Sequence, residues 1–198
     1  MNPPTSRVDL SNGWELIADS FIAKRNSGIG VTNVKIWAES LEPGATVLDI
    51  GCGFGGPYTQ LLINAGFIVY GIDASPTFIK EYQRRFPQAE AKCEAAEASS
   101  YFDRKFDGVV AIGLMFILSE EAQLKVLQKV ASSLNAGGKF LFTSPYQICT
   151  WQDILTGRQS KSLGKEAYVR EMLNQGLLLA GEYSDEGENH YFDFRKSP

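Results

Sequence analysis

The chain has 198 residues, of which 44% are hydrophobic and 21% are charged, and its formal net charge is −4. This length allows one domain with its own core, and the composition is too apolar for a disordered chain. One histidine and 3 cysteines are too few for a zinc site of several histidines or of four cysteines, so no metal site is expected. The odd, widely spaced cysteines favour a reducing compartment over a disulfide framework.

Targeting signals and charge clusters are not visible in the sequence. The first residues, MNPPTSRVDLSNGW, lack the basic start and apolar core of a signal peptide. The longest apolar run, 108–118, falls short of the roughly 20 residues that span a membrane. Lysines and arginines are scattered rather than gathered in a stripe. We therefore expect a cytoplasmic protein that binds neither nucleic acid nor a membrane.

Two helices are predicted before the first strand. Apolar residues recur at helical spacing over 14–21, with Ser11 or Asn12 placed to cap the helix. A second helical pattern covers 31–41. Residues 1–41 are thus expected to form a helical N-terminal cap.

Strands and helices then alternate. Strand patterns occupy 46–50, 67–72, 89–93, 106–112 and 139–143, and helical patterns occupy 57–66, 75–86, 119–134 and 162–176. The stretch 145–163 is polar and long for a connector, which suggests a lid over a binding cleft.

Two strand patterns, 177–183 and 190–195, close the chain. The six polar residues between them are enough to join antiparallel neighbours but too few for a parallel crossover. The whole chain is therefore predicted to be a single domain over 1–198. Its fold class is a three-layer α/β sandwich with a mostly parallel sheet and an antiparallel C-terminal hairpin.

A glycine-rich turn follows the first predicted strand. Gly51, Gly53 and Gly56 fit G-x-G-x-x-G between a strand and a helix, where backbone can approach a ligand closely. Asp73, at the end of the second strand, is placed to accept hydrogen bonds from ribose hydroxyls. A tight turn with a helix cap would explain the glycines alone, but glycines and acid together favour a nucleotide-like cofactor.

Asp49 separates two candidate cofactors. It lies two residues before the first glycine, where a dinucleotide-binding loop usually has an apolar residue. A carboxylate there is poorly suited to a pyrophosphate but well suited to an ammonium group. S-adenosylmethionine has an ammonium, a sulfonium and no phosphate, so it is favoured over NAD.

Five segments in order resemble the motifs of class I S-adenosylmethionine-dependent methyltransferases. They cover about 42–145 and read VLDIGCGFGG, VYGIDAS, CEAAEAS, KFDGVVAIG and LNAGGKFLFTSP. The resemblance implies a Rossmann-like, seven-stranded sheet and S-adenosylmethionine as cofactor. It says almost nothing about the methyl acceptor.

The resemblance also implies roles for individual residues on the cofactor side. Asp49, Gly51 and Gly53 would hold the methionine portion, Asp73 would bind the ribose, and Ala74 would lie beside the adenine. The backbone N–H of Ala96 could meet the adenine edge, while Glu94 and Glu97 both remain candidates for its amino group. Ile112 or Gly113 would line the methionine side. Arg25 resembles a basic residue that in some members pairs with the cofactor carboxylate, although an ordinary solvated arginine is an equal alternative.

The acceptor side departs from the family. Many small-molecule methyltransferases carry a Glu-His pair after the fourth strand, and here Phe116 and Ile117 stand at those positions. This indicates an apolar acceptor wall, unless these residues simply pack in the core. Tyr146 and Trp151, in the possible lid, are further candidates for acceptor contacts. A motif of the Asn-Pro-Pro-Tyr type, which would indicate nucleic acid bases or protein glutamine, is missing after the fourth strand.

His190 is the one candidate catalytic side chain. It begins the last predicted strand, whose start should lie at the cofactor end of the sheet if the strand before it runs parallel to the core strands. A structural histidine is the competing explanation.

The leading hypothesis is an S-adenosylmethionine-dependent methyltransferase that acts on a small molecule by in-line displacement. The alternatives are an NAD-dependent oxidoreductase and a non-catalytic module that binds the cofactor. The acceptor atom, the need for a general base and the oligomeric state are left open.

Overall fold

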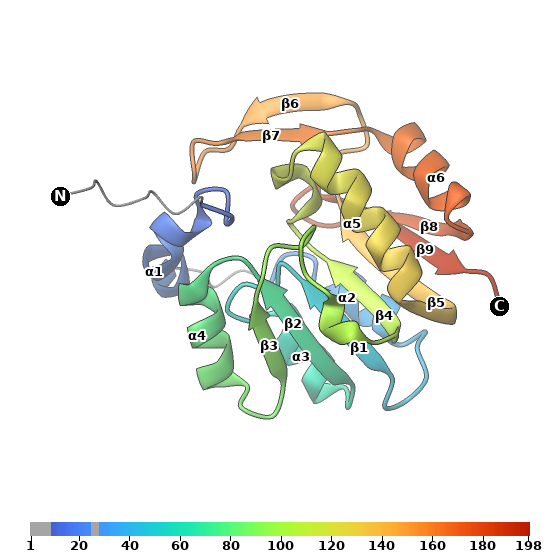
Figure 1. The fold of residues 1–198 in the computed structure, drawn as a ribbon, viewed down its shortest axis with the longest axis horizontal. Coiled ribbons are helices and arrows are strands. Elements are labelled where there is room, and N and C mark those ends of the chain that lie inside the picture. Colours follow the sequence, from blue (N-terminus) through green and yellow to red (C-terminus); the bar gives the residue numbers. More distant parts are fainter. Residues whose placement is uncertain (1–8, 25–27) are drawn as a thin grey trace.

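A computed structural model describes residues 9–24 and 28–198 and shows a seven-stranded sheet in the order β3-β2-β1-β4-β5-β9-β8 (Figure 1). The strands are β1 (Thr46–Ile50), β2 (Ile68–Asp73), β3 (Glu90–Cys93), β4 (Phe106–Ala111), β5 (Leu134–Thr143), β8 (Leu177–Ser184) and β9 (His190–Lys196). The first five are mutually parallel, and β9 is antiparallel to both β5 and β8. The predicted fold class is confirmed, including the C-terminal hairpin.

The helices lie on both faces of this sheet, with one more beside its edge (Figure 1). They are α1 (Trp14–Lys24), α2 (Val31–Ala38), α3 (Tyr58–Asn64), α4 (Pro76–Arg85), α5 (Glu120–Ser133) and α6 (Lys165–Asn174), with short 3-10 turns η1 (Tyr101–Asp103) and η2 (Met115–Ile117). Helices α5 and α6 pack together on one face, and α2 and α3 pack together on the other. Helix α1 contacts α4.

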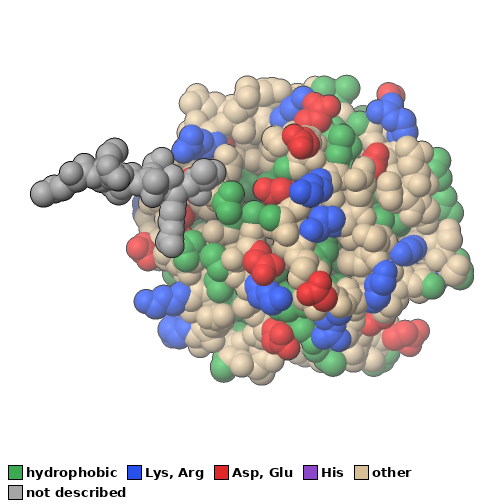
Figure 2. Space-filling view, viewed as in Figure 1, with side chains coloured by type: hydrophobic (Ala, Val, Ile, Leu, Met, Phe, Trp, Pro, Cys, Tyr) green, Lys and Arg blue, Asp and Glu red, His purple; other side chains and the backbone are tan. Residues whose placement is uncertain are grey.

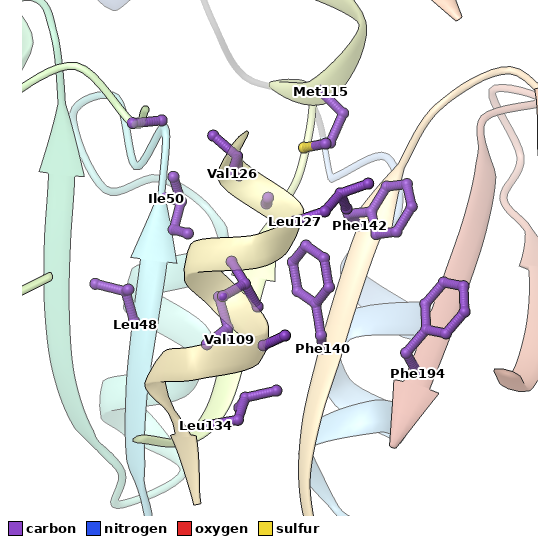
Figure 3. Packing of buried hydrophobic residues seen from close by; sticks show 14 of the residues in the cluster. Leu48, Ile50, Val109, Met115, Val126, Leu127, Leu134, Phe140, Phe142 and Phe194 are labelled. Atoms are coloured by element: carbon purple, nitrogen blue, oxygen red, sulfur yellow. The ribbon is translucent and has the colours of Figure 1, made fainter. Parts of the chain in front are cut away.

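Alternating residues along the strands explain the two faces. Leu48, Val109 and Phe140 belong to the cluster beneath α5 and α6, whereas their neighbours Val47 and Val110 pack beneath α2 and α3. Figure 3 shows side chains of α5 directed into the first cluster. Both faces of the central strands are buried, which explains their continuous apolar runs.

The N-terminal helices are docked by specific contacts. The Ser11 hydroxyl accepts a hydrogen bond from the Glu15 N–H at 2.9 Å, which confirms Ser11 as a cap of α1. The Glu15 carboxylate reaches the start of α4, where it accepts hydrogen bonds from the hydroxyls of Ser75 and Thr77. Helix α2 ends at Ala38, three residues earlier than expected.

The stretch 145–163 is more ordered than its polar sequence indicates. It forms a separate antiparallel hairpin of β6 (Cys149–Gln152) and β7 (Gln159–Ser162), which lies above the end of the main sheet (Figure 1). Asp153 stabilises the turn because its carboxylate accepts hydrogen bonds from the backbone N–H groups of Leu155 and Thr156. A local Asp turn and two short strands thus replace the predicted irregular connector.

On the face drawn in Figure 2, positive and negative side chains are interspersed, and neither sign forms a continuous area. Within the described residues, no helix is long and apolar enough to cross a membrane.

Candidate active site

A cavity of about 390 Å³ opens at the carboxyl ends of the parallel strands, where ligands bind in open α/β sheets. Its lining comes from the glycine turn, the ends of β2 and β4, the segment after β3, the N-terminal cap and the β6–β7 turn. The predicted cofactor residues that line it are Asp49, Gly51, Gly53, Asp73, Ala74, Ala96, Glu97 and Ile112. The structure therefore brings together eight residues that were chosen from separate motifs.

The glycine turn leaves open space for a ligand. Gly53 has a φ of +53°, and no atom lies within 4 Å of the position a Cβ would occupy there. Gly55, which the sequence motif did not single out, is required for packing: with a φ of +82°, its Cβ would lie 2.3 Å from the Phe86 ring. One glycine thus admits the ligand while another fits the turn against α4.

Asp73 is held by the backbone on both sides. Its Oδ2 accepts the Gly53 N–H at 3.0 Å, and its Oδ1 accepts the Ser75 N–H at 2.8 Å. A carboxylate has about four acceptor sites, so both oxygens keep capacity for ribose hydroxyls. Burial raises the pKa of Asp73 to about 6, against the opposing effect of the two backbone hydrogen bonds.

Asp49 is almost completely buried, with 3% of its surface exposed. Its Oδ2 accepts a hydrogen bond at 2.7 Å from the hydroxyl of Thr59, a residue in the first turn of α3. Burial raises the pKa of Asp49 to about 7; the charge of Asp73 adds to the rise and the Thr59 hydrogen bond opposes it. A buried carboxylate with so high a pKa favours a cationic ligand, which would restore its ordinary ionisation.

The segment after β3 supplies a second acidic wall. Glu94, Ala96 and Glu97 all line the cavity, and the Oε2 atom of Glu94 is buried without a hydrogen-bond partner. A buried carboxylate oxygen without a donor is costly, and an amino group of a ligand would satisfy it. Glu94 therefore suits the adenine amino group better than Glu97, which has no buried carboxylate oxygen without a hydrogen-bond partner.

The cap closes the cavity with aromatic rings. Trp14 and Phe21 of α1 form an aromatic cluster with Phe54 of the glycine turn and Phe78 of α4, in which the ring centroids of contacting pairs are 5.0–6.4 Å apart. All four line the cavity. The sequence indicated a helical cap over 1–41, but it did not single out Phe54 or Phe78 as cavity residues.

Glu15 was missed because an acidic residue in a first helical turn is common. It connects α1 to Ser75, whose N–H in turn holds Asp73. Burial would raise the pKa of Glu15, but the hydrogen bonds from Ser75 and Thr77 outweigh it and hold that pKa below its usual value.

The acceptor side of the cavity is largely apolar. After β4, the chain contributes Leu114, Phe116, Ile117 and Leu118, and across from them lie Leu10 of the cap and Leu155 of the hairpin turn. Of the predicted acceptor residues, Phe116 lines the cavity. Trp151 does not line it but packs on the Phe116 ring, with centroids 5.5 Å apart. Thr143 adds a polar group, and its hydroxyl accepts the Gly113 N–H at 2.7 Å.

Tyr146 and His190 lie outside the lining. Their rings pack edge to face, with centroids 5.4 Å apart, and His190 also packs on Phe192. The His190 Nε2 lies 3.1 Å from a carboxylate oxygen of Glu182. The neighbours of His190 in sequence, Asn189 and Tyr191, do line the cavity. This environment suits a structural histidine and gives the predicted catalytic role no support.

Two further predictions concern Arg25 as a partner of the cofactor carboxylate and the absence of a metal site. Arg25 lies outside the described residues. Among the described residues, no group of three or more His, Cys, Asp or Glu side chains is placed to hold a metal ion.

Parallel strands, a glycine turn and an acid at the end of β2 define a Rossmann-like domain that binds an adenosine-containing cofactor. Residues 47–138 match a family model described as a methyltransferase domain. Over this stretch the chain matches the methyltransferase family, and similar structures with bound S-adenosylmethionine support that compound as its cofactor.

Individual relatives agree with this assignment. The chain is 39% identical over 77 residues to the 2-methyl-6-phytyl-1,4-hydroquinone methyltransferase of Synechocystis, covering 37% of this chain and 24% of that protein. The CcbJ methyltransferase of Streptomyces caelestis has a similar fold, with a TM-score of 0.75, 12% identity and coverage of 96% and 98%. Magnesium protoporphyrin IX methyltransferase from Synechocystis, solved with bound S-adenosylmethionine, gives a TM-score of 0.64 at 19% identity, covering 100% and 86%. The chain spans less than two thirds of the length of the curated relatives it matches.

Proposed function

We propose that this protein transfers the methyl group of S-adenosylmethionine to a small-molecule acceptor. The observation that carries the proposal is a pair of carboxylates, the buried Asp49 and the half-buried Asp73, on either side of the open glycine turn. Asp73 would hold the ribose, Asp49 the ammonium end and Glu94 the adenine amino group. The bound cofactor supplies an electrophilic methyl group on a sulfonium.

The charge of the lining argues against NAD. Asp49 faces the turn where a dinucleotide would place its pyrophosphate, whereas Asp73 would suit the ribose of either cofactor. None of the described lining residues is a lysine, an arginine or a histidine, so the Asp49 carboxylate would repel a doubly charged pyrophosphate. The oxidoreductase alternative is therefore not favoured.

The protein's contribution to catalysis would be alignment and exclusion of water. Methyl transfer from a sulfonium needs an attacking atom in line with the bond that breaks, and holding both partners in place accelerates such a step. The aromatic rings of the cap and the apolar residues after β4 enclose the cavity, which removes water that would compete or screen charge.

A small-molecule acceptor is supported by two observations. The cavity is enclosed on one side by α1 and on the other by the β6–β7 turn, so it admits a compact ligand rather than a folded macromolecule. The names of the similar proteins also indicate small acceptors, a phytyl hydroquinone for one and a magnesium protoporphyrin for another.

Calorimetry with S-adenosylhomocysteine, the demethylated product, tests the cofactor assignment. We expect saturable binding at one site and no saturable binding of NAD at the same concentrations. A labelled-methyl assay over metabolite extracts, with mass identification of the product, then tests transfer. Binding of NAD in preference to S-adenosylhomocysteine would reject the proposal, and tight cofactor binding without transfer to any extract would favour a non-catalytic module.

A further inference from the structure

The walls of the cavity differ in chemistry. One wall carries Asp49 and Asp73 with the glycine turn, and Glu94 and Glu97 continue the acidic lining after β3. A second wall follows β4 and is built from Leu114, which lies beside Gly51, and from Phe116, Ile117 and Leu118. The cofactor assignment accounts for the first wall, so the second is available to the acceptor.

The rim of the cavity beside this apolar wall also carries apolar side chains. Leu10 and Leu155 line the cavity although 59% and 51% of their surfaces are exposed, and the adjacent Ile154 is 94% exposed. The two segments that carry these leucines meet, because a Cβ on Gly13 would lie 3.2 Å from side-chain atoms of both Thr156 and Arg158. Exposed apolar side chains at the rim of a cavity indicate a ligand that continues outward as an apolar body.

The charge of the lining restricts the other end of the ligand. Five carboxyl residues line the cavity, namely Asp49, Asp73, Glu94, Glu97 and Asp153, and the described lining residues include no basic side chain to balance them. Once Asp49, Asp73 and Glu94 are assigned to the cofactor, Glu97 and Asp153 remain, and their charge disfavours phosphate, sulfate and carboxylate groups on the acceptor. Neutral and cationic groups meet no such barrier.

We propose that the acceptor is an amphipathic molecule without a negative charge: a neutral or cationic head with an apolar body that leaves the cavity between Leu10 and Leu155. The inference rests on the methyltransferase function proposed above and narrows its substrate class. The charge of the lining therefore disfavours phosphorylated metabolites, coenzyme A thioesters and free carboxylic acids as acceptors of this protein.

Three probes with the same eight-carbon body isolate the head-group charge. Octylamine, octan-1-ol and octanoate are titrated at pH 8 into the protein saturated with S-adenosylhomocysteine. We expect octylamine and octan-1-ol to bind at least tenfold more tightly than octanoate. Octan-1-ol should also bind about tenfold more tightly than hexan-1-ol, because each buried methylene contributes roughly a threefold to fourfold gain.

A pair of matched variants locates the apolar exit. Leu155→Ser should weaken octan-1-ol binding about threefold. It should also reduce the difference in affinity between octan-1-ol and hexan-1-ol. Leu178→Ser changes a leucine of similar exposure (57%) on β8, outside the cavity lining, and should leave both values unchanged.

The outcomes separate this inference from the proposed function. Failure to bind S-adenosylhomocysteine would reject the methyltransferase function. In a protein that does bind it, equal binding of octanoate, absence of a chain-length effect, or no binding of any probe would overturn the amphipathic, non-anionic acceptor. An equal effect of Leu155→Ser and Leu178→Ser would overturn the proposed exit.

Discussion

The cofactor half and the acceptor half of the cavity are built in different ways. On the cofactor side, one short stretch of chain supplies the glycine turn, Asp49 and Asp73, and the backbone itself fixes the ligand-binding carboxylate. On the acceptor side, the lining comes from Leu10 before α1, from η2 and from the β6–β7 turn, which are far apart in sequence. The cofactor half can be recognised in the sequence as a motif, whereas the residues of the acceptor half come together only in the folded chain.

The largest expected effect is on the ribose site. Asp73→Ala should weaken S-adenosylhomocysteine binding about 100-fold, because loss of two charge-assisted hydrogen bonds costs roughly 3 kcal/mol. Calorimetry measures the change, and circular dichroism checks that the variant is folded. Asp19→Ala removes an exposed carboxylate on α1 and serves as the control. Unchanged affinity in Asp73→Ala would remove the ribose assignment.

Asp49 should give a pH-dependent effect. With pKa values of about 7 for Asp49 and about 6 for Asp73, both carboxyls lose their charge as the pH falls from 8 to 5. Affinity for S-adenosylhomocysteine, which carries an ammonium group, should therefore fall tenfold or more over this range. Asp49→Asn should bind weakly at pH 8 and show a flatter profile; a wild-type profile in this variant would show that Asp49 does not contact the cation.

The same substitution should stabilise the protein without ligand. A carboxyl with a raised pKa in the folded state lowers stability as the pH rises from about 4, its unfolded value, to about 7. Asp49→Asn removes this penalty, so its melting temperature at pH 8 should exceed that of the wild type by several degrees. Thermal unfolding at pH 8 and at pH 4 checks the sign, because the gain should disappear at pH 4.

Glu15 tests whether the cap supports the cofactor half. Glu15→Gln weakens the hydrogen bonds to Ser75 and Thr77, and we expect a three- to tenfold faster dissociation of S-adenosylhomocysteine in stopped-flow measurements. Leu16→Gln, an exposed position on the same helix, is the matched control. Equal dissociation rates in the two variants would show that the cap does not retain the cofactor.

The smallest effect is expected at His190. Because its ring contacts Tyr146, Phe192 and Glu182 rather than the cavity, His190→Ala should lower stability by about 1 kcal/mol and change cofactor affinity less than twofold. Once an acceptor is known, a large loss of turnover with unchanged stability would restore the catalytic role predicted from the sequence.

The sequence was sufficient for the sheet and for the cofactor half because both depend on local patterns. Short apolar runs predicted the central strands, and the position of Asp49 and Asp73 at the ends of two such runs predicted that both lie at one edge of the sheet. The hairpin of β6 and β7 could not be read in this way, since its strands are four residues long and partly polar. Glu15 was hidden as well, and the sequence could not choose between Glu94 and Glu97, because both questions depend on which buried atoms lie beside these side chains.

The hydrogen bonds of Glu15 bear on how ligands would leave the cavity. The helix that it ties to the ribose loop also begins beside Asn12, whose amide donates to the carbonyl of Ile117 in the acceptor wall. The start of α1 and the turn before it are therefore bonded both to the ribose loop and to the acceptor wall. A movement of this segment away from one site would also break its contact with the other, so release of the demethylated cofactor and of the methylated product would depend on the same motion.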